Sequence, residues 1–338
     1  MPSHYDALLV LSFGGPEKPE DVLPFLENVL RGKNVPRERM LAVAEHYYNF
    51  GGVSPINQQN RNLIAALKSH LEQQQMPLPI YWGNRNWHPM LADTVRKMKD
   101  DGVKNALAFV TSAYSSYSSC RQYLEDIHNA REATGPGAPR IEKLRVFFNH
   151  PGFINAMADR IASAIKSIPN PERKTLEIVY TAHSIPEVMS AECDYVKQLH
   201  ESCRLVTGKL GDFSWQLNYQ SRSGAPSQPW LEPDICDALR MVKTRGTTRH
   251  VIIVPIGFVS DHMEIIFDLD TEAREICNEL NIEMVRAKTV GSHPDFVAMI
   301  HNLIREKMEG LPPEFLGELG VRVESCPVNC CPSGRPSV

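Results

Sequence analysis

Three acidic residues in the second half of the chain have a spacing that could handle a metal ion. Glu264, Asp268 and Glu272 lie at i, i+4 and i+8, which places them on one face of a helix. Like charges at this spacing destabilise a helix by about 0.2–0.5 kcal/mol per pair, and a cation would offset that cost. Carboxylate oxygens suit divalent ions such as Fe²⁺ or Mg²⁺. The alternative is a solvated surface, with Asp261 and Glu264 forming a capping box.

A histidine at the end of a predicted strand is a candidate base. His183 follows the apolar run 176–182, and an imidazole that is neutral at pH 7 can accept a proton. The alternative is a structural histidine bonded to a backbone carbonyl. Polar or aromatic side chains also follow the runs 106–111, 215–219 and 251–258. Ligands of open parallel sheets bind beyond the carboxyl ends of the strands, so we expect the site there.

Three cysteines near the C-terminus, Cys326, Cys330 and Cys331, offer thiols to a metal centre. Zn²⁺ or an iron–sulfur cluster normally takes four ligands, so one would come from elsewhere in the chain. The spacing is not that of a standard zinc site, and a reduced tail without metal is the alternative. Neighbouring Cα atoms are only ~3.8 Å apart, so Cys330 and Cys331 both bind only if their side chains diverge.

Eight short apolar runs alternate with amphipathic stretches and are expected to be the strands that position these residues. Most runs are continuous, which is typical of parallel strands covered on both faces. Strands alternating with helices predict a doubly wound α/β protein, with four strands on each side of residue 150. The predicted strands are Ala7–Ser12, Ile80–Trp82, Ala106–Thr111, Val146–Phe148, Leu176–Ala182, Trp215–Tyr219, Val251–Phe258 and Ile282–Val285.

Length and composition fit two ordinary folded units. The chain has 338 residues, 42% hydrophobic and 22% charged, which excludes a mainly disordered chain and a small disulfide scaffold. Its net charge of −4 gives no global field for nucleic acid or anionic lipid. The first residues lack a signal-peptide pattern, and no apolar run reaches the ~20 residues that cross a bilayer. We therefore expect a cytoplasmic protein without a transmembrane segment, whose cysteines are reduced.

Five ordered blocks make the chain resemble the ferrochelatase family over about residues 5–310. The resemblance implies a chelatase fold of two Rossmann-like, doubly wound parallel-sheet halves, residues 1–150 and 151–310, with a porphyrin cleft between them. Residues 311–338 would form a separate cysteine-rich tail. The implied reaction inserts Fe²⁺ into a porphyrin in haem biosynthesis. The blocks are Leu9–Pro16, Gly51–Ile56, Thr181–Pro186, Gln220–Arg222 with Pro229–Pro233, and Pro255–Glu264.

The resemblance also assigns catalytic roles, motif by motif. His183 corresponds to the invariant histidine of the family and Glu264 to its partner carboxylate. Both would act in catalysis and meet the Fe²⁺ substrate. Asp268 and Glu272 would then form an outward acidic path for the metal. The expected chemistry is removal of two pyrrole protons while the macrocycle is held bent, which exposes its nitrogen lone pairs. His183 would accept pyrrole protons on one side, and Glu264 would help bind the iron or the released proton.

Three further positions look like porphyrin contacts of the family, namely Phe13, Ser54 and Tyr123. Many Gram-positive relatives have a tyrosine at the position of Phe13, where it can ligate the product iron. A phenylalanine cannot, so the resemblance does not carry that ligand to this chain. The motifs SFGGP, FGGVSPI, GNRNW and YSSC look most like those of actinobacterial-type enzymes, which metallate coproporphyrin III rather than protoporphyrin IX.

The tail resembles the extension of those ferrochelatases that carry a [2Fe–2S] cluster. In them, three tail cysteines join one cysteine from the body. The implied ligands here are Cys326, Cys330 and Cys331, together with Cys120, which lies in the loop that supplies the fourth ligand in relatives. The adjacency of two tail cysteines departs from the pattern, so one of them is open to doubt as a ligand.

Three other functions stay open at this point. They are insertion of iron into protoporphyrin IX, a same-fold chelatase for cobalt or nickel and another tetrapyrrole, and a haem carrier that lost catalysis. A carrier should lack the base at 183 or the acid at 264, and both are present. The expected partners are the porphyrin, Fe²⁺ and other enzymes of the haem pathway, with no nucleic acid. The chain is expected to be a monomer.

Overall fold

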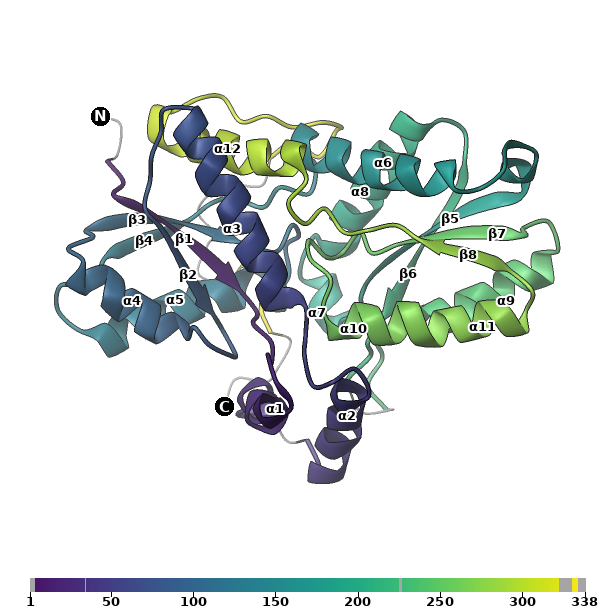
Figure 1. Cartoon of the computed structure of the whole chain (residues 1–338), viewed down its shortest axis with the longest axis horizontal. Helices are drawn as coiled ribbons and strands as arrows, with labels where there is room; N and C mark the ends of the chain where they lie inside the picture. Colours follow the sequence, from purple (N-terminus) through teal and green to yellow (C-terminus); the bar gives the residue numbers. More distant parts are fainter. Residues whose placement is uncertain (1–3, 34, 225–226, 322–329, 334–338) are drawn as a thin grey trace.

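Two four-stranded parallel sheets form the framework of the molecule in the computed structural model, which describes residues 4–33, 35–224, 227–321 and 330–333. The strand order is β2-β1-β3-β4 in the first sheet and β6-β5-β7-β8 in the second, so both halves have the same topology (Figure 1). The strands are β1 (Ala7–Ser12), β2 (Ile80–Asn84), β3 (Asn105–Val110), β4 (Arg140–Lys143), β5 (Leu176–His183), β6 (Ser214–Gln220), β7 (His250–Val254) and β8 (Glu283–Arg286).

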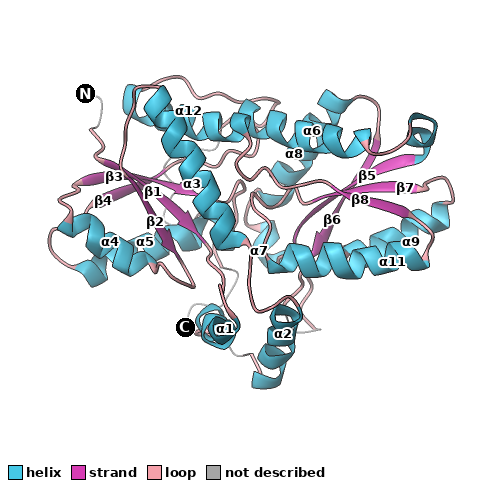
Figure 2. Ribbon diagram, viewed as in Figure 1, coloured by secondary structure: helices cyan, strands magenta, loops and turns pink. Residues whose placement is uncertain are grey.

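Helices cover both faces of each sheet, as Figure 2 shows. The central strands β1 and β7 are buried at every residue, which explains their continuous apolar sequences. None of the described helices is long and apolar enough to cross a membrane. The helices are α1 (Val22–Leu30), α2 (Arg37–Asn49), α3 (Ile56–Gln73), α4 (Leu91–Asp100), α5 (Gln122–Thr134), α6 (Pro151–Lys166), α7 (Glu187–Ala191), α8 (Tyr195–Leu210), α9 (Ile235–Arg245), α10 (Met263–Ile265), α11 (Arg274–Glu279) and α12 (Pro294–Glu309).

The predicted fold class is confirmed, but one predicted strand is wrong. Val146–Phe148 has no strand structure, and the fourth strand of the first sheet is β4. Strand β4 lies at the sheet edge, and its partly exposed Arg-Ile-Glu-Lys sequence carries a weak apolar signal. Val146–Phe148 is apolar because it is buried in the core instead. The Phe147 ring stacks on Phe109 at 5.4 Å and meets Phe296 at 5.7 Å between centroids.

One hydrophobic core and a buried ion pair join the two halves. The core is continuous from the first sheet, through α6 and α12, to the second sheet. Arg145 donates to Glu306 of α12 through Nε at 2.7 Å and a terminal nitrogen at 2.8 Å. Both side chains are almost fully buried. The same guanidinium donates to the backbone oxygen of Glu314, so the segment after α12 is held against the first half.

The helix pair α1–α2 lies apart from the sheets, at the lower edge of Figure 1. Helix α2 contacts the second half at two points. The His46 ring stacks on Phe267 with 3.7 Å between centroids, and Arg39 donates to the backbone oxygen of Gly224. Glycines 51 and 52, both with positive φ, then turn the chain into α3. Helix α2 therefore lies next to the segment that carries the candidate acids.

Candidate active site

His183 is the last residue of β5, and its two ring nitrogens have different surroundings. Nδ1 lies 2.5 Å from the backbone oxygen of Ser184. That oxygen can only accept a hydrogen bond, which assigns the ring hydrogen to Nδ1 and leaves a lone pair on Nε2. The hydroxyl of Tyr195 donates to the backbone oxygen of His183 at 3.0 Å. The carbonyl-bonded histidine and the candidate base are thus the same residue, with Nε2 available for proton transfer.

Glu264 faces this lone pair from the neighbouring strand end. It lies on α10, which follows β7, and β7 pairs directly with β5. Its Oε2 is 3.7 Å from Nε2 of His183, and both side chains are partly exposed. The same oxygen lies 3.9 Å from Nδ1 of His262. Burial lowers the pKa of His262, and the charge of Glu264 opposes that effect. The two predicted catalytic residues are therefore brought together.

Asp268 is a partly buried acid whose pKa is raised. Burial is the main cause that raises its pKa to about 7, and the charges of Glu264 and Glu272 add to the rise. Gln220 donates to Oδ2 of Asp268 through Nε2 at 3.2 Å, and the hydroxyl of Ser221 donates to the same oxygen. Burial and the charge of Asp234 also raise the pKa of Glu272. The acids repel one another and would accept a cation.

The helix that carries these acids is not the predicted α-helix. Residues Ile266–Ala273 form a π-helix between α10 and α11, and π-helical turns inside longer helices are frequent at functional sites. The capping-box alternative is wrong, because His262 holds the N-cap position and no side chain caps the helix. Asp261 instead accepts from Arg286 at 3.0 Å and from Gln59 of α3 at 3.2 Å.

The three predicted porphyrin contacts lie in the first half with different exposure. Phe13 is half-buried, and its ring meets Phe25 at 6.2 Å in the cluster formed by α1 and α2. Ser54 is buried, just before α3. Tyr123 is also buried, and the Arg85 guanidinium lies 3.7 Å from its ring centroid. Only Phe13 presents an appreciable surface to a ligand in this arrangement.

The cysteines near the two predicted cluster segments are partly described by the structure. Cys120 is buried in a π-helical turn, Tyr117–Arg121, and Cys331 is buried at the other end of the chain. The sulfurs of Cys330 and Cys331 lie 3.5 Å apart. Burial raises the pKa of Cys331 to about 12, with further rises from Cys330, Cys120 and Cys193. Cys326 lies outside the described residues. Within the described ranges, no three His, Cys, Asp or Glu side chains are set to hold a metal ion.

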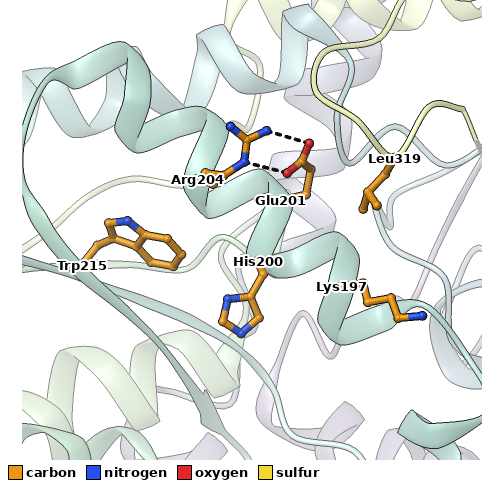
Figure 3. A pocket seen from close by; sticks show the side chains of 6 residues that line it. All are labelled: Lys197, His200, Glu201, Arg204, Trp215 and Leu319. Atoms are coloured by element: carbon orange, nitrogen blue, oxygen red, sulfur yellow. Dashed lines mark hydrogen bonds and ion pairs between the residues drawn. The ribbon is translucent and has the colours of Figure 1, made fainter.

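A hollow of about 440 Å³ lies beside α8, and none of the predicted site residues lines it (Figure 3). Glu201 and Arg204 form an ion pair in its wall at 2.9 Å. The backbone N–H of Glu318 donates to the same glutamate, so the segment after α12 closes one side. The lining residues are Lys197, His200, Glu201, Arg204, Trp215 and Leu319.

Four side chains around the site were given no individual role by the sequence reasoning, although three of them lie in the strand-end segments that it singled out. His262 stands two positions before Glu264 in the segment that follows β7, which the strand-end rule singled out without giving this histidine a role. Gln220 and Ser221 also follow a strand, but their binding of Asp268 depends on how β6 meets the π-helix. No sequence signal indicates that Tyr195 of α8 bonds to the strand-end carbonyl.

The fold is shared with known chelatases. A structure of the sirohydrochlorin chelatase SirB from Bacillus subtilis subspecies spizizenii in complex with cobalt aligns with a TM-score of 0.53 and 12% identity, over 91% of this chain and 97% of that chain. A structure of SirB from Bacillus subtilis with Fe³⁺ gives a TM-score of 0.56 at 12% identity, over 91% and 98%. The chain is thus an α/β protein with the chelatase fold.

The particular family follows from the sequence match. The ferrochelatase family model matches residues 5–308, and the chain belongs to this family. A Rhodopirellula baltica protein called ferrochelatase is 58% identical over 328 residues, covering 97% of this chain and 93% of its own. A Nocardia farcinica protein called coproporphyrin III ferrochelatase is 48% identical over 346 residues, covering 98% of both chains. A Mycolicibacterium smegmatis protein of that same name is 49% identical over 312 residues, covering 91% and 92%.

Proposed function

We propose that this protein inserts Fe²⁺ into coproporphyrin III in haem biosynthesis. The observation that carries the proposal is the 3.7 Å approach of His183 Nε2, at the end of β5, to Glu264 Oε2 on α10, which follows the paired strand β7. The names of the actinobacterial relatives support the choice of porphyrin. The proposed working place is the cytoplasm, where iron and thiols are kept reduced, and the proposed unit is a monomer that exchanges its porphyrin with other haem-pathway enzymes.

The proposed chemistry conserves protons and charge. A free-base porphyrin carries two pyrrole N–H groups, and two protons leave as Fe²⁺ takes their place. His183 accepts a pyrrole proton at Nε2, because Nδ1 is committed to the Ser184 carbonyl. Glu264 takes this proton from the imidazolium across 3.7 Å and releases it to solvent, so that Nε2 can then accept the second pyrrole proton. Phe13, Ser54 and Tyr123 are the proposed porphyrin contacts of the first half.

The acidic row is the proposed route of the metal. Asp268 and Glu272 would pass Fe²⁺ toward Glu264, and each ionises reluctantly until a cation is near. Asp268→Ala and Glu272→Ala should raise the Fe²⁺ concentration needed for half-maximal rate more than they lower the maximal rate. Unchanged iron dependence in both variants would refute the route while leaving the metallation reaction itself intact.

An anaerobic metallation assay tests the central proposal. Fe²⁺ is supplied with coproporphyrin III or protoporphyrin IX in parallel, with Co²⁺ and Ni²⁺ as further arms. We expect fastest product formation from Fe²⁺ and coproporphyrin III, and near-complete loss in His183→Ala. His200→Ala is the matched control, since His200 is exposed on α8 and lines the hollow described above. Full turnover in His183→Ala would contradict the role of His183 as base. If the wild type forms no product with any of the three metals, only the carrier function remains.

We also propose a [2Fe–2S] cluster bound by Cys120, Cys330, Cys331 and one more cysteine, which the resemblance assigns to Cys326. The support for this proposal is the chemistry of the donors, because thiolates are the usual ligands of such a cluster; the described cysteines alone do not form a group of three metal ligands. Two sulfurs bound at ~2.3 Å to one tetrahedral metal lie ~3.8 Å apart, close to the 3.5 Å between Cys330 and Cys331. A purified protein that is red-brown, with visible bands lost on reduction, would support the cluster. Stoichiometric zinc in a colourless protein would contradict it.

A further inference from the structure

Strand β6, at the edge of the second sheet, has one wholly polar face. Its apolar residues stand at every second position and pack in or against the main hydrophobic core. Side chains alternate between the two faces of a strand, so the polar residues between them share the opposite face. These polar residues are Ser214, Gln216, Asn218 and Gln220. Sheets covered by helices on both faces normally have apolar residues on both, so this face is unusual.

The polar face runs from solvent to the candidate active site. Ser214 is exposed, Gln216 is half-buried, and the next two polar residues are buried. Gln216 pairs in register with Val179, which packs with residues of α9 and of the π-helix, so these helices cover this face. At the inner end, Gln220 pairs in register with His183. Six steps of about 3.3 Å along the strand give a path of ~20 Å.

Polar atoms on this face are buried without hydrogen-bond partners among the described residues. They are both amide atoms of Asn218, Oε1 of Gln220 and Nε2 of Gln216. The hydroxyl of Thr181 on β5 is also unpartnered, and Thr181 pairs in register with Asn218, which places it on the same face. Asn218 and Thr181 are fully buried. Buried polar groups in native proteins almost always bind either protein or ordered water.

The mixture of donors and acceptors selects water as the partner. Amide nitrogens only donate hydrogen bonds, amide oxygens only accept them, and a hydroxyl does both. A cation would be repelled by the amide N–H groups, and an anion would be repelled by the amide oxygens. A water molecule meets both kinds of group, and buried waters typically make about three such bonds.

We propose that the polar face of β6 holds a chain of bound water molecules that carries protons from the active site to solvent at Ser214. The inference rests on the proposed metallation reaction and adds the route by which Glu264 releases its protons. Gln220 links the two, because its Nε2 donates to the backbone oxygen of Glu264 at 3.3 Å. In the proposed reaction the porphyrin covers the exposed side of His183 and Glu264, so protons leave through the interior.

The transfer along this chain is balanced. Each water accepts a proton on its oxygen and gives another of its protons to the next water. Two protons therefore reach solvent for each Fe²⁺ that enters the porphyrin, and no group of the chain keeps a charge.

A substitution at the middle of the face tests the route. Asn218→Leu keeps the size of the side chain and removes both amide atoms. We expect the maximal rate of Fe²⁺ insertion into coproporphyrin III to fall about tenfold, with unchanged KM for both substrates. Asn218→Ser, which leaves room for one more water, should retain most of the rate. Asn129→Leu is the control, since Asn129 is exposed on α5. The full rate in Asn218→Leu would overturn the route.

A high-resolution crystal structure of the wild type tests the water itself. We expect ordered waters within hydrogen-bond distance of the side chains of Gln216, Asn218 and Gln220. A wild type in which these amides bond to protein atoms, or face a dry space, would overturn the inference. So would a higher melting temperature of Asn218→Leu at an unchanged rate, because removing a dry, unpaired amide stabilises a protein.

Two further results keep this inference separate from the proposed function. A wild type that contains the waters but does not metallate porphyrin would overturn the proton route together with the proposed function. A wild type that metallates at the same rate as Asn218→Leu would overturn the route alone. If Asn218→Leu does not fold, Gln216→Leu at the half-buried outer part of the face takes its place, with the same expected loss of rate.

Discussion

Replacing Asp268 by asparagine should stabilise the metal-free protein in a pH-dependent way. Burial and neighbouring carboxylates raise the pKa of Asp268 from 3.8 to about 7. The folded chain then binds this proton more tightly than the unfolded chain does, so stability falls as pH rises from about 4 to about 7 and is level above that. A rise of this size corresponds to about 4 kcal/mol at pH 8, using about 1.4 kcal/mol for each pH unit. Asparagine has the same shape and carries no charge.

The assay is urea denaturation of Asp268→Asn and wild type at several pH values, with a chelator present. The gain in the free energy of unfolding should be near zero at pH 4 and approach about 4 kcal/mol at pH 8. Asp212→Asn is the control, since Asp212 is exposed on the loop before β6. The reasoning fails if the gain is the same at both pH values, or if the variant is less stable than wild type at pH 8.

Three other substitutions test contacts that hold the site in place. Glu306→Gln leaves the buried guanidinium of Arg145 without a charged partner and should lower the free energy of unfolding by about 3–5 kcal/mol. A denaturant midpoint within error of wild type would contradict this. Gly15→Ala places a Cβ 2.8 Å from that of Ser54 and should lower the free energy of unfolding by about 1–3 kcal/mol, measured by thermal melting. An unchanged melting temperature would show that the loop moves to accept the methyl group. Tyr195→Phe removes the hydroxyl that donates to the backbone oxygen of His183. It should lower the free energy of unfolding by about 0.5–1.5 kcal/mol and slow metallation. An unaltered metallation rate would show that this hydrogen bond does not contribute to catalysis.

The sequence could predict the fold class because parallel strands buried on both faces are continuously apolar. The prediction missed β4, an edge strand with three charged residues in four and therefore no apolar run. It also placed a strand at Val146–Phe148, which is apolar because it is buried in the core. Tertiary burial between the two halves, rather than pairing in a sheet, selects those residues. An apolar run indicates that a segment is buried. The run alone does not show whether the segment is a strand of a sheet or a loop packed between the two halves.

The candidate site was predictable where chemistry follows a strand, and not where it depends on packing. His183 ends β5 and Glu264 lies on α10, which follows the paired strand β7, so the topology brings them to the same edge of the sheet. The partners of Asp268 and the orientation of His183 depend on side chains from β6 and α8, for which local sequence gives no signal. The π-helix was missed because acids at i and i+4 are compatible with an α-helix.

The buried pair of Arg145 and Glu306 has a consequence for synthesis of the chain. These residues are separated by 161 positions, and the guanidinium also holds the backbone of Glu314. During translation, the N-terminal sheet emerges long before the carboxylate that neutralises this cation. A nascent chain that stops short of α12 keeps an unpaired charge in its first half, so premature termination near the end should yield a product prone to degradation rather than a shortened enzyme.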